Sequence, residues 1–335
     1  MKLINLALTD MSKILTGAQI RIFELATNLG GVFIHGIRKH RFPNYIKALP
    51  SLFTADNVLI YEYNLRFPDL PLINILKHHS QILFDVADVP HLQAIYSGLS
   101  KVIDRKLEEN FFKLFNVADV LLFAGRWDRL LGSNCLCKKN VLMVPNAANP
   151  KFFIPSPLPR GKHKTVLYVG GYAPARGIDI LIDAFQLVRE KNRDAVLKLV
   201  GFNMPTWLNG KGLIIERNKF YKDMPGIYSD SYLCVIPHKK NPHMDSALPI
   251  KLYEAMAASR PVVVTNCLEM ARLVNEEKCG VVTKCDAKSL SEGIEYLISN
   301  PAIAEEMGFR GREAIEKRHS WKHRAEAIRK CLRTH

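Results

Sequence analysis

Two glycines and an arginine near the middle of the chain form the first pattern that could bind an anion. Gly170 and Gly171 follow the apolar segment 165–169, and Arg176 comes shortly before a segment with helical spacing. Glycine lets the backbone approach a phosphate closely, and the start of the next helix adds N–H groups and a positive dipole end. Arg176 adds a fixed charge that can chelate phosphate oxygens. A tight turn between a strand and a helix, with a solvent-exposed arginine, explains the same residues equally well.

A second polar group lies in the segment 245–265, which contains Lys251 and Glu254. A carboxylate on a helix at the carboxyl ends of a parallel sheet can accept hydrogen bonds from both hydroxyls of a ribose. Glu254 is the candidate for that role, and the alternative interpretation makes it a solvated helix residue. This segment taken alone favours the solvated residue.

Short apolar segments typical of strands alternate with segments in which apolar residues recur at helical spacing. The expected strands are residues 3–8, 58–61, 81–86, 120–123, 140–144, 165–169, 196–200, 232–236 and 262–265. The expected helices are residues 18–29, 98–117, a helix starting at 177, and 250–258, 289–298, 301–317 and 321–332. This alternation predicts an α/β fold whose parallel sheets are covered by helices on both faces.

A proline-rich segment, residues 145–164, divides the chain and shows little periodicity. Proline restricts its own backbone and that of its neighbour, so we expect an extended linker there. The 335 residues are enough for two domains of roughly 150 to 180 residues each. We therefore expect an N-terminal domain over 1–158, a C-terminal domain over 159–318, and a closing helical segment, 319–335, that could pack back on the N-terminal domain.

The net charge of +15 is spread over both halves of the chain. Residues 1–150 carry 17 Lys and Arg against 12 Asp and Glu, and residues 151–335 carry 30 against 20. Such a surface favours nucleotides, phospholipid head groups, phosphorylated acceptors or nucleic acid as partners. The basic and aromatic segment 35–47 is the candidate for contact with an anionic acceptor or membrane, or it is a solvated surface loop. Since no nucleic-acid-binding module accompanies the charge, we expect no nucleic-acid partner.

The cysteines and the hydropathy pattern bear on metal binding and location. Seven cysteines are irregularly spaced, and the pair Cys135 and Cys137 lacks a second ligand pair, so we expect reduced thiols and no metal site. No apolar run reaches the ~20 residues of a membrane helix, and the N-terminal residues are typical of a strand rather than a signal peptide. We expect a cytoplasmic protein, with peripheral contact at the inner membrane face as a further expectation.

The motifs of the C-terminal half resemble the nucleotide-sugar domain of family 4 glycosyltransferases, which have the GT-B fold. In the first half, 17–29 resembles that family's glycine-led first helix, and Val-Pro-Asn at 144–146 resembles the motif that closes its first domain. The matching stretches follow one another in order over nearly the whole chain. In the second half they are 166–185, 197–201, 249–258, 260–264, 280–283 and 319–321.

The resemblance implies an α/β, GT-B architecture in which two Rossmann-like parallel-sheet domains face each other across a cleft. It also implies transfer of a sugar, with retention, from a nucleotide-sugar donor to a glycan, lipid-linked or protein-linked acceptor. Glu254 corresponds to the glutamate that holds the donor ribose, and Arg176 stands where a lysine contacts the donor diphosphate. Gly17 stands where a glycine loop lies against the donor phosphates, and Lys251 is a further phosphate candidate in an Ala-Leu-Pro-x-Lys-Leu-x-Glu version of the motif.

Two sets of site residues follow. The candidate catalytic residues are Arg176, Lys251 and Asp245. The candidate donor-binding residues are Gly17, Gly170, Gly171, Glu254, Ser246, Ala247 and Leu248.

This chain departs from the family pattern at three positions. Ser246 occupies the place of the family's first glutamate, with Asp245 beside it, and Gly171 replaces an arginine that often follows the strand glycine. In the first domain, Ala87 occupies the position of a histidine, and His91 lies nearby in sequence.

No Asp-x-Asp motif occurs in the chain, so we expect a reaction without a bound metal and without a cofactor other than the donor substrate. Arg176 and Lys251 could stabilise the leaving diphosphate instead. Other GT-B enzymes, such as epimerases or phosphorylases, are one alternative. A non-catalytic protein that binds a sugar nucleotide is another, favoured by Ser246 and Ala87. A nicotinamide-dependent dehydrogenase is disfavoured because no G-x-G-x-x-G follows either first strand.

Overall fold

The structure is a computed structural model of the chain. It describes residues 2–7, 16–35, 48–61, 69–97, 105–132, 136, 139–161, 163–217 and 219–332. Most of the basic and aromatic segment 35–47, the start of the expected helix 98–117, and Cys135 and Cys137 lie outside these ranges. The chain forms two compact units, the first comprising Met1–Ile95, Lys101–Pro145 and Trp321–His335, and the second Tyr96–Ser100 and Asn146–Ser320.

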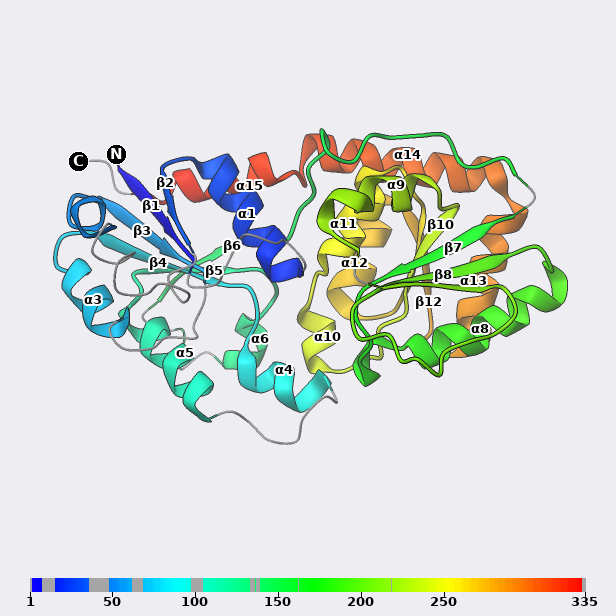
Figure 1. Cartoon of the computed structure of the whole chain (residues 1–335), viewed down its shortest axis with the longest axis horizontal. Coiled ribbons are helices and arrows are strands. Elements are labelled where there is room, and N and C mark those ends of the chain that lie inside the picture. The colour runs from blue at the N-terminus through cyan, green and yellow to red at the C-terminus, as the bar shows by residue number, and fades with distance from the viewer. Residues whose placement is uncertain are drawn as a thin grey trace. The chain divides into compact units, whose positions relative to one another are not determined.

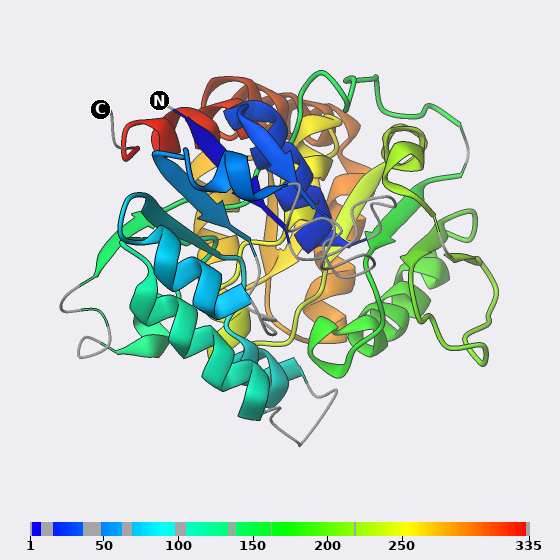
Figure 2. The ribbon, with the colours of Figure 1, turned by 60° about the vertical axis from the view of Figure 1, so that its left-hand side comes forward.

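The first unit contains a six-stranded sheet in the order β2-β1-β3-β4-β5-β6, with parallel pairing throughout. In Figure 1, α1 and α15 lie on one side of this sheet, and α3 and α5 lie on the other. Figures 1 and 2 both show α15 beside α1, which it contacts. The strands are β1 (Leu3–Leu6), β2 (Val32–Ile34), β3 (Asn57–Ile60), β4 (Gln81–Val86), β5 (Val120–Phe123) and β6 (Asn140–Met143). The helices are α1 (Gly17–Leu29), α3 (Asp69–Leu76), α4 (Pro90–Ser97), α5 (Arg105–Val117), α6 (Asp128–Leu131) and α15 (Trp321–Arg329).

The second unit contains another six-stranded parallel sheet, in the order β12-β11-β10-β7-β8-β9. Its strands are β7 (Thr165–Val169), β8 (Val196–Gly201), β9 (Leu213–Arg217), β10 (Leu233–Ile236), β11 (Val262–Thr265) and β12 (Gly280–Thr283). Its α-helices are α8 (Ile178–Lys191), α9 (Met224–Ser229), α10 (Pro242–Ser246), α11 (Ile250–Ala257), α12 (Leu268–Glu277), α13 (Ala287–Ser299) and α14 (Pro301–Lys317). The short 3-10 turns are η1 (Pro174–Arg176) and η2 (Tyr221–Asp223). The two sheets confirm the α/β class with parallel sheets that the sequence predicts.

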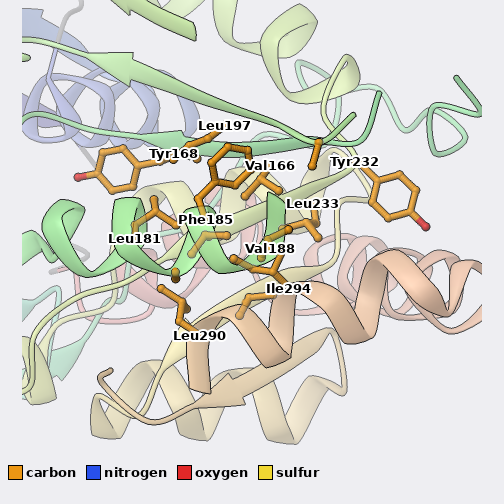
Figure 3. Packing of buried hydrophobic residues seen from close by; sticks show 14 of the residues in the cluster. Val166, Tyr168, Leu181, Phe185, Val188, Leu197, Tyr232, Leu233, Leu290 and Ile294 are labelled. Carbon is orange, nitrogen blue, oxygen red and sulfur yellow. The ribbon is translucent and has the colours of Figure 1, made fainter. Parts of the chain in front are cut away.

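The hydrophobic core of the second unit lies between its sheet and the pair α8 and α13 (Figure 3). Val166 of β7, Phe185 of α8 and Leu290 of α13 are all at most 2% exposed. The chain moves from β7 to β8 in one direction along the sheet, and from β10 through β11 to β12 in the opposite direction. Because such crossovers are right-handed, α11 and α12 cover the face of the sheet opposite to α8. Buried on both faces, the inner strands can be continuous apolar runs.

The proline-rich segment is held on the second unit by two arginines. Arg312 of α14 donates hydrogen bonds to the carbonyl oxygens of Phe153 and Ala257, and to that of Pro150 at 2.9 Å. Arg260, which is fully buried, donates to the Ser156 carbonyl. The first unit therefore ends at Pro145 along this part of the chain, earlier than the boundary at residue 158 that the sequence predicts.

Gly177 joins the turn after β7 to the turn after β10. Its φ of 66° lies in the left-handed region, and a Cβ atom there would lie 1.8 Å from the Pro237 carbonyl oxygen. Two residues after Pro237, the Lys239 N–H donates to the Ala175 carbonyl oxygen at 2.9 Å. Only glycine permits both this backbone conformation and this contact, so the two turns are fixed against each other.

None of the helices in the described ranges combines the length and the apolar character that a membrane crossing needs.

We expect the stability of the first unit to depend on a buried ion pair between α1 and β4. Arg21 Nη2 lies 2.6 Å from Asp85 Oδ1, and both side chains are at most 2% exposed. Arg21→Met should lower the free energy of unfolding by about 3–5 kcal/mol, because it leaves the Asp85 carboxylate buried beside no arginine. Urea unfolding measures this loss.

A matched control is Arg126→Met, which removes the 2.7 Å pair with Asp128 at the surface. That change should cost no more than about 1 kcal/mol. Equal losses of unfolding free energy in the two variants would contradict the prediction, because the buried pair would then stabilise the protein no more than the surface pair does.

Candidate functional site

The candidate site lies at the carboxyl ends of β7 and β10, the two central strands of the second sheet. Successive strands extend from β7 in one direction and from β10 in the other, so this is the switch point of the sheet. Open parallel sheets bind ligands outside the carboxyl ends of their strands at such a point, because the loops there diverge. Gly170 follows β7 directly, and the turn Pro237–His238 follows β10.

Lys251, in the first turn of α11, brings a cationic nitrogen into this region. The residue as a whole is partly exposed, but its Nζ is buried and has no hydrogen-bond partner among the residues that the structure describes. Nζ lies 4.3 Å from the centroid of the Tyr168 ring, which is a cation–π contact. Burial, with the nearby charge of Arg176, holds the pKa of Lys251 well below the ordinary lysine value.

Gly170 marks the point at which three polar groups converge. A methyl group on this residue would lie 2.5 Å from Lys251 Nζ, 3.1 Å from the Tyr168 hydroxyl oxygen and 3.3 Å from Arg176 Nη1. Its φ of 143° is also one that other residues rarely adopt. The missing side chain therefore keeps open the small region that the two cations share.

Arg176 ends the turn η1 and points its guanidinium back toward the loop after β7. Its Nη1 donates to the Gly171 carbonyl oxygen at 3.3 Å, and the buried Tyr168 hydroxyl donates to the same oxygen at 3.1 Å. Burial raises the pKa of Tyr168 to about 12, so its hydroxyl remains a neutral donor. The structure thus brings the predicted residues Gly170, Gly171, Arg176 and Lys251 together.

Glu254 lies one turn further along α11 and is buried rather than solvated. Its Oε2 accepts a hydrogen bond from the Tyr228 hydroxyl at 2.9 Å. That hydroxyl also contacts the Lys251 carbonyl oxygen at 3.4 Å. Burial and the charge of Glu254 raise the pKa of Tyr228 well above its ordinary value, so Tyr228 acts as a donor to the carboxylate.

The remaining predicted residues of this segment make local structural contacts. Asp245 Oδ1 accepts from the Leu268 N–H at 2.9 Å, which caps the start of α12. The buried Ser246 hydroxyl donates to the Pro242 carbonyl oxygen within α10 at 3.0 Å. Ala247 is partly exposed, and the Leu248 carbonyl oxygen accepts from the Asn146 side chain at 2.8 Å. No contact that the structure gives for Asp245 reaches Arg176 or Lys251.

Gly17 belongs to the first unit, where it is the first residue of α1. Thr16 caps this helix, because its hydroxyl accepts from the Gln19 N–H at 3.3 Å and the Gln19 side chain accepts from the Thr16 N–H at 3.1 Å. Ala87 is partly exposed after β4, and His91 lies on α4.

Sequence reasoning missed Tyr168, Tyr228 and His238. Tyr168 is part of an apolar strand and looks like an ordinary core residue. His238 comes two residues after β10, and a polar residue just beyond a buried strand is a signal that could have drawn attention to it.

These contacts define a site suited to an anion. Two cationic groups lie at one switch point, and the three atoms that would lie nearest to a methyl group on Gly170 include no carboxylate oxygen. A phosphate group placed there would gain charge-assisted hydrogen bonds from both cations. In the described ranges, no group of three or more His, Cys, Asp or Glu side chains is arranged to hold a metal ion.

The chain is similar to known glycosyltransferases in sequence and in fold. The family model described as glycosyl transferases group 1 matches residues 163–300, which contain β7 to α13. A glycosyltransferase of Methanocaldococcus jannaschii, itself uncharacterized, is 22% identical over 314 residues, which are 89% of this chain and 84% of that protein. The chain is a glycosyltransferase of the GT-B type.

Solved structures of other proteins are similar in fold to this glycosyltransferase. The sucrose-phosphate synthase from Thermosynechococcus elongatus has a TM-score of 0.73 at 15% identity, with 99% of this chain and 98% of that chain covered. The Anabaena protein HepE, in complex with UDP and glucose, has a TM-score of 0.70 at 14% identity, with 99% of both chains covered. The predicted GT-B fold is confirmed.

Several sequence relatives have a named activity. The phosphatidyl-myo-inositol mannosyltransferase of Mycobacterium leprae is 27% identical over 219 residues, which are 63% of this glycosyltransferase and 57% of that enzyme.

We expect the protonation of Lys251 to respond to a bound diphosphate. In the free protein, burial and Arg176 lower the pKa of Lys251. Negative charge beside Nζ favours the ammonium form and raises that pKa again, so binding should take up a proton wherever the pH lies between the two values. Calorimetry with uridine and guanosine diphosphates over a series of pH values below the ordinary lysine pKa, in buffers of different ionisation enthalpy, measures this uptake.

Lys251→Met should remove the uptake, whereas Lys240→Met, at an exposed neighbouring lysine, should preserve it. Equal proton uptake by the wild type and Lys251→Met would show that Lys251 does not change its protonation on binding.

Proposed function

We propose that this glycosyltransferase moves a sugar from a nucleotide-sugar donor to a glycan, lipid-linked or protein-linked acceptor, with retention and without a bound metal. The observation that supports it most strongly is the convergence of Lys251 Nζ and Arg176 Nη1 beside Gly170. The donor diphosphate would occupy this region.

The two cations would act on the leaving group of the reaction. When the bond between the sugar and the diphosphate breaks, negative charge grows on the diphosphate oxygens and the sugar gains oxocarbenium character. Positive groups that are already in place stabilise this charge without reorganising. Arg176 has the fixed charge and the forked geometry for two oxygens, and Lys251 is a point charge in a region of low solvent access.

Glu254 would hold the donor ribose. Its carboxylate is one helical turn from Lys251 and is oriented by the Tyr228 hydroxyl at 2.9 Å. A carboxylate can accept from two hydroxyl groups at once, which suits the adjacent hydroxyls of a ribose. Gly17 of the first unit remains a proposed phosphate contact, on the basis of its place in the glycine-led helix.

A non-catalytic sugar-nucleotide-binding protein is the second candidate, and one observation favours it. Where the family carries its first glutamate, the Ser246 hydroxyl is buried and bonded to Pro242, and the adjacent Asp245 caps α12. Both side chains thus bond within the protein, and neither of these contacts assigns a sugar-binding role to them. Donor binding without transfer or donor hydrolysis would favour this candidate.

A panel of nucleotide sugars tests the proposed function. We expect one donor to be hydrolysed slowly by the wild type without an acceptor, and the anomeric configuration of a transfer product tests retention.

Glu254→Ala should weaken binding of that donor by about 1–3 kcal/mol, the scale of lost charged hydrogen bonds. Arg176→Ala should lower turnover, whereas the melting temperature, which reports on folding, should change little. Wild-type donor affinity in Glu254→Ala, with the fold intact, would remove Glu254 from the site.

Turnover should survive complete removal of divalent metal. Arg176 and Lys251 can lower the free energy of the same developing charge on which a metal would act. The assay compares turnover after exhaustive chelation with turnover after Mg²⁺ or Mn²⁺ is added back. Mild stimulation by metal is compatible with the proposal, because metals also neutralise free nucleotide. Activity that vanishes with the chelator and returns with metal would contradict it.

A further inference from the structure

His238 is a buried side chain beside the two cations for which the proposed function gives no role. The residue is 5% exposed, and its Nε2 is buried with no hydrogen-bond partner among the described residues. The positive charges that act on it come from Lys251 and Arg176, and His243 of α10 is a third neighbour. An unpaired buried nitrogen of this kind costs free energy unless a ligand satisfies it.

The backbone around His238 is held firmly. Three side-chain donors at the carboxyl ends of β11 and β12 converge on its carbonyl oxygen: the Thr265 hydroxyl at 2.6 Å, the Cys267 thiol at 3.5 Å and the Cys285 thiol at 3.6 Å. Next to it, the Lys239 N–H bonds to Ala175, directly before Arg176. The backbone of His238 is thus fixed against the turn that carries Arg176, which limits where its ring can lie.

The chemistry around the imidazole favours an anionic oxygen as its partner. Burial, together with the charges of Lys251 and Arg176, holds the pKa of His238 well below the ordinary histidine value, so the ring is neutral and has one N–H. If Nε2 carried the lone pair, Lys251 or Arg176 would be the natural donor to it, and neither donates to it in the part of the chain that the structure describes. In the tautomer with the N–H on Nε2, the ring presents a buried donor to which no described residue offers an acceptor.

We propose that His238 is a third ligand of the donor diphosphate, donating a hydrogen bond from Nε2 to a phosphate oxygen beside Arg176 and Lys251. This inference rests on the proposed function and adds a residue to its site. A neutral donor contributes a directional hydrogen bond without adding a third charge to a region that already contains two. His238 would thereby favour an acceptor with several adjacent oxygens, as in a diphosphate, over a single carboxylate.

The test is binding of inorganic pyrophosphate, which has neither ribose nor base, at about pH 8 in the absence of metal. His238→Met removes the N–H at similar size and should weaken binding about tenfold to a hundredfold, the scale of losing a hydrogen bond to a charged group. His238→Gln retains an N–H near the position of Nε2 and should bind within about threefold of the wild type. His163→Met, at an exposed histidine before β7 and so at the opposite end of the strands, should change nothing.

A second measurement does not depend on a variant that folds. In the wild type, the ¹⁵N signal of His238 Nε2 should shift when pyrophosphate is added, with the shift of a nitrogen that gains an acceptor. An unchanged signal at saturation would overturn the proposal.

The outcomes separate this inference from the function on which it rests. Wild-type pyrophosphate affinity in His238→Met, together with lost binding in Arg176→Met, would reject the role of His238 and leave the proposed function standing. A wild type that binds neither pyrophosphate nor any nucleoside diphosphate would reject both.

Discussion

The burial of a lysine nitrogen beside an arginine is the constraint on which the organisation of the second unit's site depends. Removing an ammonium group from water is costly unless an opposite charge compensates for it. In the described part of the chain, Lys251 Nζ has an aromatic ring at 4.3 Å in place of a hydrogen-bonding anion. A cation–π contact contributes about 0.5–2 kcal/mol, less than a desolvated charge requires. The cost is expressed as the lowered pKa of Lys251 in the free protein, which the charge of Glu254 offsets only in part, and an anion beside Nζ would raise that pKa again.

In the first unit, by contrast, the buried cation is paired with a carboxylate. There Arg21 is paired with Asp85 through short hydrogen bonds, the Nη2 contact at 2.6 Å and the Nε contact at 2.9 Å. A carboxylate in that position neutralises the guanidinium permanently, so the pair joins α1 to β4 and has little affinity left for an anion. A carboxylate beside Gly170 would pair with Lys251 and Arg176 in the same way and would repel a phosphate placed there.

The sequence predicts the central strands well because both faces of each are buried. Gln81–Val86, Val120–Phe123, Thr165–Val169 and Val262–Thr265 match the expected bounds, and Pro301–Lys317 matches the expected helix. The strands that sequence reasoning missed are β2, β9 and β12, which lie at or near the sheet edges. β2 has three residues, and the half-exposed β9 carries Glu and Arg at its end, so neither shows a strong apolar run. In the site, spacing identified Arg176, Lys251 and Glu254, but the contacts of Tyr168 and His238 depend on which strands neighbour each other, and spacing along the chain does not contain that information.

Lys251 and Glu254 are three residues apart on α11, so this one short helix would place them against two different parts of a bound nucleotide. Residues three apart lie on neighbouring parts of a helix surface, about one turn along its axis. Lys251 directs its Nζ toward Tyr168 and Gly170 of the β7 loop, and Glu254 directs its carboxylate toward Tyr228 of α9. The Tyr228 hydroxyl touches both the Glu254 carboxylate and the Lys251 carbonyl, so the two positions cannot move independently. A diphosphate and the ribose attached to it are separated by a similar small step, and α11 would therefore fix the distance between the group that leaves and the group that anchors it.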